Sequence, residues 1–153
     1  MCEGGAVPAD QMSTEGFVDG LCEVVPTTRS LVDEHVKDYD GEVLLHLLVG
    51  EVLTFAVASF ERGDEPVTTP LLDYVDLALR TGDDPLQDAI AVSFVEDTRW
   101  WDPAMHAFIA TWPNALTAEV NSQKAWRRRQ ILKNVTRPDL RATLRRRRSY
   151  VKA

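Results

Sequence analysis

An unusually apolar segment, residues 43–60, constrains the fold of this chain more than any other feature. Its hydrophobic residues recur around most of the circumference of a helix, and Glu51 lies near its middle. A charge at the centre of a segment barely long enough to cross a bilayer argues against a membrane helix. A helix that is apolar on nearly all sides must be surrounded by other helices. We therefore expect a helix over residues 42–62 at the centre of a soluble domain with no membrane partner.

Helix start and stop signals recur along the rest of the chain. Thr14 and Thr28 can cap two short helices that end before Pro26 and Gly41. No segment shows sustained strand alternation. The sequence predicts an all-α fold of seven or eight short helices in antiparallel pairs, packed as a bundle or a short α-solenoid around the central helix.

The helices after residue 63 have individual signals. We expect a loop over residues 64–69 and a helix that begins at Pro70, since a proline in the first helical turn loses no hydrogen bond. That helix ends at Gly82 and directs three charged side chains outward. Further helices are expected from Asp84 to about Thr98, from Asp102, from Trp112, from Ser122 and from about Pro138. The outward side chains are Asp73, Asp76 and Arg80.

The length of 153 residues and a content of 44% hydrophobic residues are typical of a single core that needs neither disulfides nor a metal. Cys2 and Cys22 are too few for a disulfide framework, and residues 1–13 have no secretory signal, so we expect a cytoplasmic protein. The expected organisation is a flexible N-terminus over residues 1–13, an acidic helical domain over residues 14–133 and a basic amphipathic helix over residues 134–153.

The charge is divided unevenly along the chain. Residues 1–120 contain five basic and 23 acidic side chains, a net charge of −18, whereas residues 121–153 contain twelve basic side chains and one acidic one, a net charge of +11. Two solvated surfaces that neutralise each other are one explanation. A binding face is the other, because net charge governs association more than fold.

No catalytic signature accompanies these helices. Glu42 with His46, and Asp102 with His106, place a carboxylate and an imidazole four residues apart on one helical face, as a metal site or an acid/base pair would. A first-turn carboxylate that favours the helix dipole is the simpler explanation. Ser93 lies mid-helix, where a hydroxyl usually bonds the carbonyl four residues back. We therefore expect no catalytic residue, metal or cofactor, and a protein that is not an enzyme.

Two groups of residues are candidate partner-binding sites. Trp100 and Trp101 are adjacent, so both cannot face inward from one helical turn, and an exposed one could anchor a partner. Alternatively, both could cap the core from a corner between helices. The other group is a cluster of carboxylates on neighbouring helices, which could bind a basic protein. These carboxylates are Asp73, Asp76, Asp83, Asp84 and Asp88.

The C-terminal segment has a sharper pattern. Its arginines are spaced by 4, 4 and 3 residues, which makes one basic face of a helix beside an apolar stripe. Such a helix can contact nucleic-acid phosphates, or it can pair with the acidic body of its own chain or of a second copy in a homodimer. The arginines are Arg137, Arg141, Arg145 and Arg148.

The sequence between Glu42 and Glu96 resembles that of a bacterial family of unknown function. The resemblance lies in the apolar helix with His46 and Gly50, in residues 80–83 (Arg-Thr-Gly-Asp), and in residues 89–96 around Ser93. Members of that family are small all-helical proteins, some of them suspected immunity proteins of polymorphic-toxin systems. The resemblance implies a helical immunity-type inhibitor, and the acidic charge of residues 1–120 predicts a non-enzymatic module that binds a basic protein partner. The alternative is a nucleic-acid-associated accessory protein that acts through the Arg-rich C-terminal segment.

Overall fold

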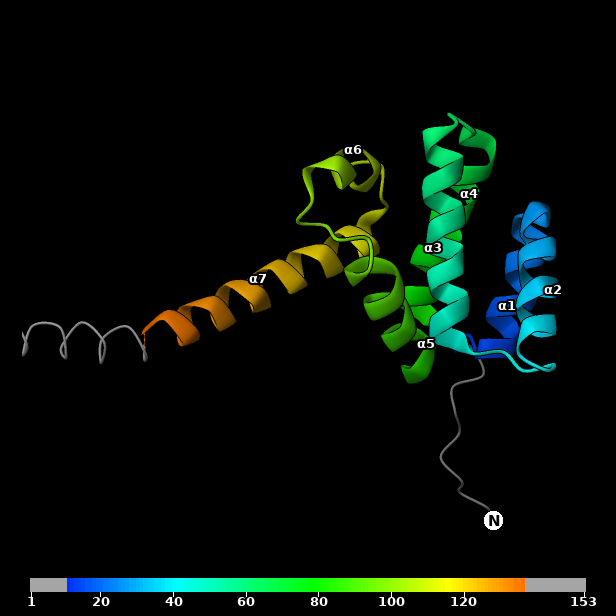
Figure 1. The fold of residues 1–153 in the computed structure, drawn as a ribbon, viewed down its shortest axis with the longest axis horizontal. Helices are drawn as coiled ribbons and strands as arrows, with labels where there is room; N and C mark the ends of the chain where they lie inside the picture. Colours follow the sequence, from blue (N-terminus) through cyan, green and yellow to red (C-terminus); the bar gives the residue numbers. More distant parts are fainter. Residues whose placement is uncertain (1–10, 137–153) are drawn as a thin grey trace, which may run out of the picture. The chain divides into compact units, whose positions relative to one another are not determined.

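A computed structural model of the chain describes residues 11–136 (Figure 1). In that range it contains seven α-helices, two short 3₁₀-helices (η1 and η3), one π-helix (η2) and no strand, which confirms the predicted all-α class. The elements are α1 (Thr14–Val24), η1 (Pro26–Thr28), α2 (Arg29–Asp38), α3 (Leu45–Glu61), α4 (Glu65–Thr81), α5 (Asp84–Ala89), η2 (Ile90–Glu96), η3 (Pro103–Met105), α6 (His106–Ile109) and α7 (Asn114–Thr136).

The chain divides into two compact units, residues 1–120 and 121–153, and α7 runs across the boundary. The same boundary separates the acidic part of the sequence from the basic part. The arginines predicted to form a basic helical face, from Arg137 onward, lie outside the described residues. Among residues 11–136, no helix combines the length and the apolar character needed to cross a bilayer.

The core of the first unit is built around α3, which packs against α2, α4, α5 and η2. Five apolar residues of α3 are buried, and they join the side chains of the neighbouring helices in one cluster. This agrees with the predicted central position of the apolar helix, although Leu47 on the same helix is about half exposed. The buried residues of α3 are Leu48, Val49, Val52, Leu53 and Ala56.

Neighbouring helices pair in antiparallel fashion, α1 with α2 and α3 with α4 (Figure 1). The N-terminal end of α1 is tied to the end of α4 by two backbone hydrogen bonds of Met12, which donates to Thr81 O and accepts from Asp83 N. Tyr74 of α4 stacks on Phe17 of α1 with ring centroids 5.6 Å apart. These contacts fix α1 against α4.

The start of α4 differs from the prediction. The helix begins at Glu65, with Pro66 in its first turn and Pro70 inside it, so the expected loop over residues 64–69 is wrong. Pro70 cannot donate to the carbonyl of residue 66, which lies only one residue from the start of the helix at an exposed position. Thr68 supports the turn, because its hydroxyl donates to Asp64 O at 3.0 Å.

The helix that begins after Asp83 is α-helical only to Ala89 and continues as the π-helix η2. A π-helix has hydrogen bonds between residues five positions apart. One of them lies at the end of η2, where Asp97 N donates to Val92 O at 3.0 Å. After η2 the chain turns through Arg99, whose φ of 59° is unusual for a residue with a side chain. The predicted restart at Ser122 is also wrong, because α7 continues through it without a break.

Candidate functional site

The structure brings together three polar side chains that are distant in the sequence, Ser93, His46 and Asp88. His46 Nδ1 lies 2.9 Å from Ser93 Oγ, and His46 Nε2 lies 3.5 Å from Asp88 Oδ2. The expectation that the Ser93 hydroxyl bonds a carbonyl of its own helix is therefore wrong. Glu42, predicted to share one helical face with His46 as a first-turn carboxylate, lies before α3, which begins at Leu45. His46 instead contacts α5 and η2.

This Ser, His and Asp arrangement has the residue types of a catalytic triad but an unfavourable setting for one. Ser93 is buried, whereas the side chains of His46 and Asp88 are mostly exposed to water. A serine nucleophile has to be reachable by substrate, and its base has to be held rigidly by the third residue. The geometry instead supports a structural tether that joins α3 to η2.

His35 is buried, with 1% of its surface exposed. Its ring joins α2 to α3 through Glu51, at an Nδ1 to Oε2 distance of 3.1 Å. Its other nitrogen, Nε2, accepts the backbone N–H of Leu44 at 3.0 Å. All of its polar atoms have intramolecular partners, so His35 serves the fold.

Asp76, predicted to face outward, is instead buried, with 6% of its surface exposed. Its Oδ1 accepts the backbone N–H of Leu116 at the start of α7, and its Oδ2 accepts Arg80 Nε at 3.1 Å. A buried carboxylate is retained when it is paired and hydrogen-bonded, and both conditions hold here. Asp76 therefore joins α4 to α7 and does not face outward as predicted.

The other predicted carboxylates lie on α4, directly before α5 and on α5. Asp83 caps α5 by accepting Leu86 N at 3.0 Å. Asp84 and Asp88 are exposed on α5, and Asp73 is exposed farther back on α4. In the described part of the chain, no group of three or more His, Cys, Asp or Glu side chains has the geometry to hold a metal ion.

The two adjacent tryptophans face different surroundings, as their spacing predicts. Trp100 is buried, whereas Trp101 is 41% exposed, and their rings meet edge to face at 5.2 Å. A hollow of about 400 Å³ lies in the same region, with Arg99 on its lining. Its lining is Leu53, Thr54, Val57, Ala58, Glu61, Asp97, Thr98, Arg99, Asp102 and Met105.

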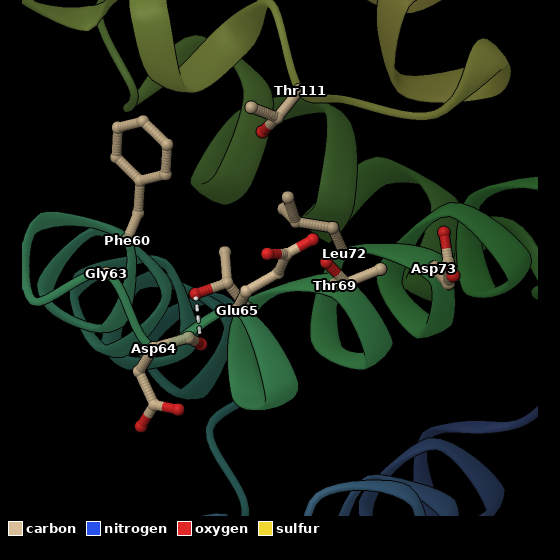
Figure 2. A pocket seen from close by; sticks show the side chains of 9 residues that line it. Phe60, Gly63, Asp64, Glu65, Thr69, Leu72, Asp73 and Thr111 are labelled. Carbon is tan, nitrogen blue, oxygen red and sulfur yellow. Dashed lines mark hydrogen bonds between the residues drawn. The ribbon is translucent and has the colours of Figure 1, made fainter.

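A second pocket, of about 370 Å³, lies where the turn between α3 and α4 meets the first turns of α4 and the loop before α7 (Figure 2). Phe60 and Leu72 supply its apolar wall, and Glu65 extends over α4 toward Leu72, while the Asp64 carboxylate points away. Gly63, with a φ of 71°, allows the tight turn at one edge. We refer to this site as the α4 pocket; its lining is Phe60, Gly63, Asp64, Glu65, Thr68, Thr69, Leu72, Asp73 and Thr111.

Three residues of the α4 pocket form one stripe along the helix. Glu65, Thr69 and Asp73 are spaced by four residues, so they lie one above the other on a single face, and all three are exposed. None of their side chains has a hydrogen bond or ion pair to another described residue. The spacing of four residues is present in the sequence. It predicts a common face only within a helix, and residues 64–69 were expected to form a loop.

The described part of the basic segment, residues 121–136, lies on α7. Trp126 is 57% exposed, and Arg127, Arg128 and Arg129 directly after it are exposed as well. Aromatic rings beside arginines are typical of surfaces that stack on nucleic-acid bases and bind phosphates. Those arginines are therefore a second candidate site, separate from the α4 pocket.

The fold defines a small all-α protein whose helices pack around one apolar helix. The chain belongs to the family described as Domain of unknown function (DUF7674), which matches residues 18–132. The match includes the α4 pocket, the Ser93–His46 contact and Arg127–Arg129, and it ends before Arg137. No curated protein and no solved structure matches the chain.

Proposed function

We propose that this protein is a binding module, not an enzyme, and that its exposed carboxylates bind a basic protein partner. The observation that supports this is the balance of surface charge in residues 11–120: fifteen of the 21 acidic side chains are exposed, against five basic ones. The exposed acidic residues are Glu15, Asp19, Glu23, Asp33, Glu34, Asp38, Asp40, Glu42, Glu61, Glu65, Asp73, Asp84, Asp88, Glu96 and Asp97.

These carboxylates are little used within the fold. Among the fifteen, only Asp88 lies within ion-pair distance of a described side chain, at 3.5 Å from His46 Nε2. Arg80, one of the five basic residues, is already held by buried Asp76. An excess of like charge destabilises a compact domain by self-repulsion. A basic partner would relieve that repulsion and would associate faster through long-range attraction.

The finer proposal is that the partner is a toxin and that the protein acts as its immunity-type inhibitor in the cytoplasm, where Cys22 stays a free thiol. It rests on the resemblance of residues 42–96 to suspected immunity proteins. A surface rich in carboxylates imitates a polyanion, so it would occupy the phosphate-binding groove of a basic nuclease. Inhibition would then need no catalytic residue and no cofactor.

The test is co-purification of the intact protein with the product of the neighbouring gene, followed by affinity measurement at low and high salt. We expect a complex whose affinity falls as salt rises, because screening shortens the range of charge attraction to about 8 Å at physiological ionic strength. Failure to bind would refute the toxin partner. Binding that is equally tight at both salt concentrations would refute recognition by charge.

A second candidate function is nucleic-acid binding through α7, supported by the exposure of Trp126 beside Arg127–Arg129. Measurement of DNA and RNA binding by the intact chain would test it, with the triple variant Arg127→Gln/Arg128→Gln/Arg129→Gln as comparison. A steep decrease of affinity with salt, reduced in the variant, is expected for phosphate contacts. No binding by the intact chain at low salt would eliminate this function.

A further inference from the structure

The α4 pocket combines an apolar wall with acidic groups that have no partner among residues 11–136. Phe60 and Leu72 line one part of it, and the stripe of Glu65, Thr69 and Asp73 lines another (Figure 2). Its lining contains no basic residue, whereas the other hollow contains Arg99. These two cavities therefore differ in the charge they favour, because the charged residues that line the α4 pocket are all acidic.

The polar groups of the pocket divide into those already used and those left open. Thr68 is satisfied by Ser59 Oγ and Asp64 O, and the Thr111 hydroxyl donates to Phe108 O at 2.7 Å. The Glu65 and Asp73 carboxylates and the Thr69 hydroxyl have no such partner among the described residues. A ligand would thus meet two anions, one hydroxyl and an apolar wall.

Lysine and arginine side chains have the matching chemistry. Their alkyl stems pack against apolar surface while the charged head stays at a polar rim. A guanidinium or ammonium group also gains attraction from an aromatic face such as that of Phe60. The volume of about 370 Å³ leaves ample room for one long side chain.

We propose that the α4 pocket is the anchor site for the basic partner, and that it receives a lysine or arginine side chain from that partner. The stem lies beside Phe60, and the head lies at the stripe of Glu65, Thr69 and Asp73, where Thr69 is four residues from each carboxylate. This inference rests on the proposed function. The inference adds the place of contact to the proposed function. The other exposed carboxylates then attract the partner but do not determine where it docks.

The experiment uses the intact protein labelled with ¹⁵N and titrated with Nα-acetyl-lysine amide and Nα-acetyl-arginine amide, observed by two-dimensional NMR. Nα-acetyl-norleucine amide, which has a similar stem and no charge, is the control ligand. We expect shifts of the amide signals of Gly63, Thr69, Asp73 and Thr111 with the two cations and much smaller ones with the control. Shifts spread evenly over the acidic helices α1 and α2 would overturn the proposal.

Matched variants separate this site from general charge attraction. Glu65→Gln/Asp73→Asn removes both pocket carboxylates, and Asp33→Asn/Asp38→Asn removes two exposed carboxylates from α2. Affinity for the partner should fall by about five- to tenfold more in the first variant than in the second, as expected when two exposed ion pairs are lost. Equal losses of affinity in the two variants would contradict the α4 pocket as the anchor site, and the proposed function would be unaffected.

Two further variants keep the test decisive. Thr69→Lys places a cation within reach of Glu65 and Asp73 on the same helix face, so it should block the acetylated ligands without unfolding α4. If instead the ligands bind only after Arg137, Arg141, Arg145 and Arg148 are changed to Gln, the chain's own basic segment fills the pocket. That result would overturn a partner side chain as the occupant.

Discussion

His35 of α2 and Glu51 of α3 are joined by a contact of 3.1 Å between Nδ1 and Oε2. The tautomer of His35 follows from its other nitrogen. Because the backbone N–H of Leu44 donates to Nε2 at 3.0 Å, Nε2 carries no proton, and the proton on Nδ1 is donated to Glu51. One imidazole thereby fixes two helices and the segment that leads into the second.

Replacement of His35 should destabilise the fold without touching the candidate sites. His35→Ala leaves the Leu44 N–H without its acceptor and removes a buried ring, so we expect a loss of about 1–3 kcal/mol in the free energy of unfolding. Urea denaturation measures this loss. His106→Ala, at an exposed position, is the control and should change stability by less than about 0.5 kcal/mol. Equal stability of both variants would contradict a structural role for His35.

Gly20 is required by the close approach of α1 to Tyr74. A Cβ at position 20 would overlap the Tyr74 hydroxyl oxygen and would lie 2.9 Å from Tyr74 Cζ. Gly20→Ala should therefore lower the melting temperature by displacing Tyr74 from Phe17 O, to which it donates at 2.8 Å. Thermal unfolding followed by circular dichroism is the measurement.

Gly50, in the interior of α3, is the matched control because nothing lies within 4 Å of its added Cβ. Gly50→Ala should raise stability by about 0.5–1 kcal/mol, the usual advantage of alanine over glycine inside a helix. The double variant Gly20→Ala/Tyr74→Phe should recover part of the stability lost at position 20, since the closest atom is then absent. No recovery would place the strain elsewhere than at the hydroxyl.

Removal of the Asp76 side chain should loosen the junction between α4 and α7. Asp76→Ala leaves the buried N–H of Leu116 unpaired and frees Arg80, which predicts a loss of about 1–3 kcal/mol. Asp76→Asn keeps an acceptor oxygen and should lose less. Asp73→Asn, on the exposed face of the same helix, should leave unfolding in urea nearly unchanged, and a loss as large as that of Asp76→Ala would contradict this assignment.

The sequence predicted which segments are helical better than it predicted which side chains meet. The central apolar helix and the starts of α1 and α5 depend on neighbouring residues, so they could be predicted locally, although the side chain that caps α1 is Ser13 and not the predicted Thr14. The burial of Asp76 depends on Leu116, 40 residues later, and the Ser93 contact depends on His46, 47 residues earlier. Spacing along one helix cannot reveal such partners.

The errors in the elements also have local physical causes. Pro70 predicted a helix start because a proline is harmless in a first turn, yet the carbonyl it leaves unbonded is only one residue from the observed start. The π-helix η2 buries the consecutive residues Ser93, Phe94 and Val95, a pattern that a helical period of 3.6 does not anticipate. The sequence did not predict the α4 pocket, because a helix that begins at Pro70 leaves Glu65 and Thr69 in a loop.

Tyr74 predicts a dependence of stability on alkaline pH. Burial, followed by repulsion from Asp19 and Glu23, raises the pKa of Tyr74 from 10.0 to about 12. The unfolded chain therefore loses this proton at a lower pH than the folded chain does. The contribution of the protonated Tyr74 side chain to the free energy of unfolding is complete below pH 10 and is lost as the pH rises from 10 to 12. Phenolate absorbance should show one tyrosine that ionises last.

Comparison with Tyr74→Phe isolates this group from the other alkaline titrations. At pH 8 the variant should be less stable than the natural chain, because it lacks the hydrogen bond to Phe17 O. The difference in the free energy of unfolding between the natural chain and the variant should become smaller between pH 10 and pH 12. A difference that stays constant over this interval would mean that Tyr74 ionises at its ordinary pKa.

Truncation after Lys133 tests whether the basic segment is part of the folded body. Every buried apolar residue in the described range lies between Phe17 and Val120, so the truncated protein retains all of that core. The sequence also predicts that Arg137, Arg141, Arg145 and Arg148 pair with the acidic body in the intact chain, and exposed pairs contribute only about 0–1 kcal/mol each. We therefore expect a folded, more acidic protein with a modestly lower melting temperature, and a difference that shrinks as salt is added. An unfolded product would show that the segment completes the core, whereas equal melting temperatures at low salt would show that it does not dock on its own body.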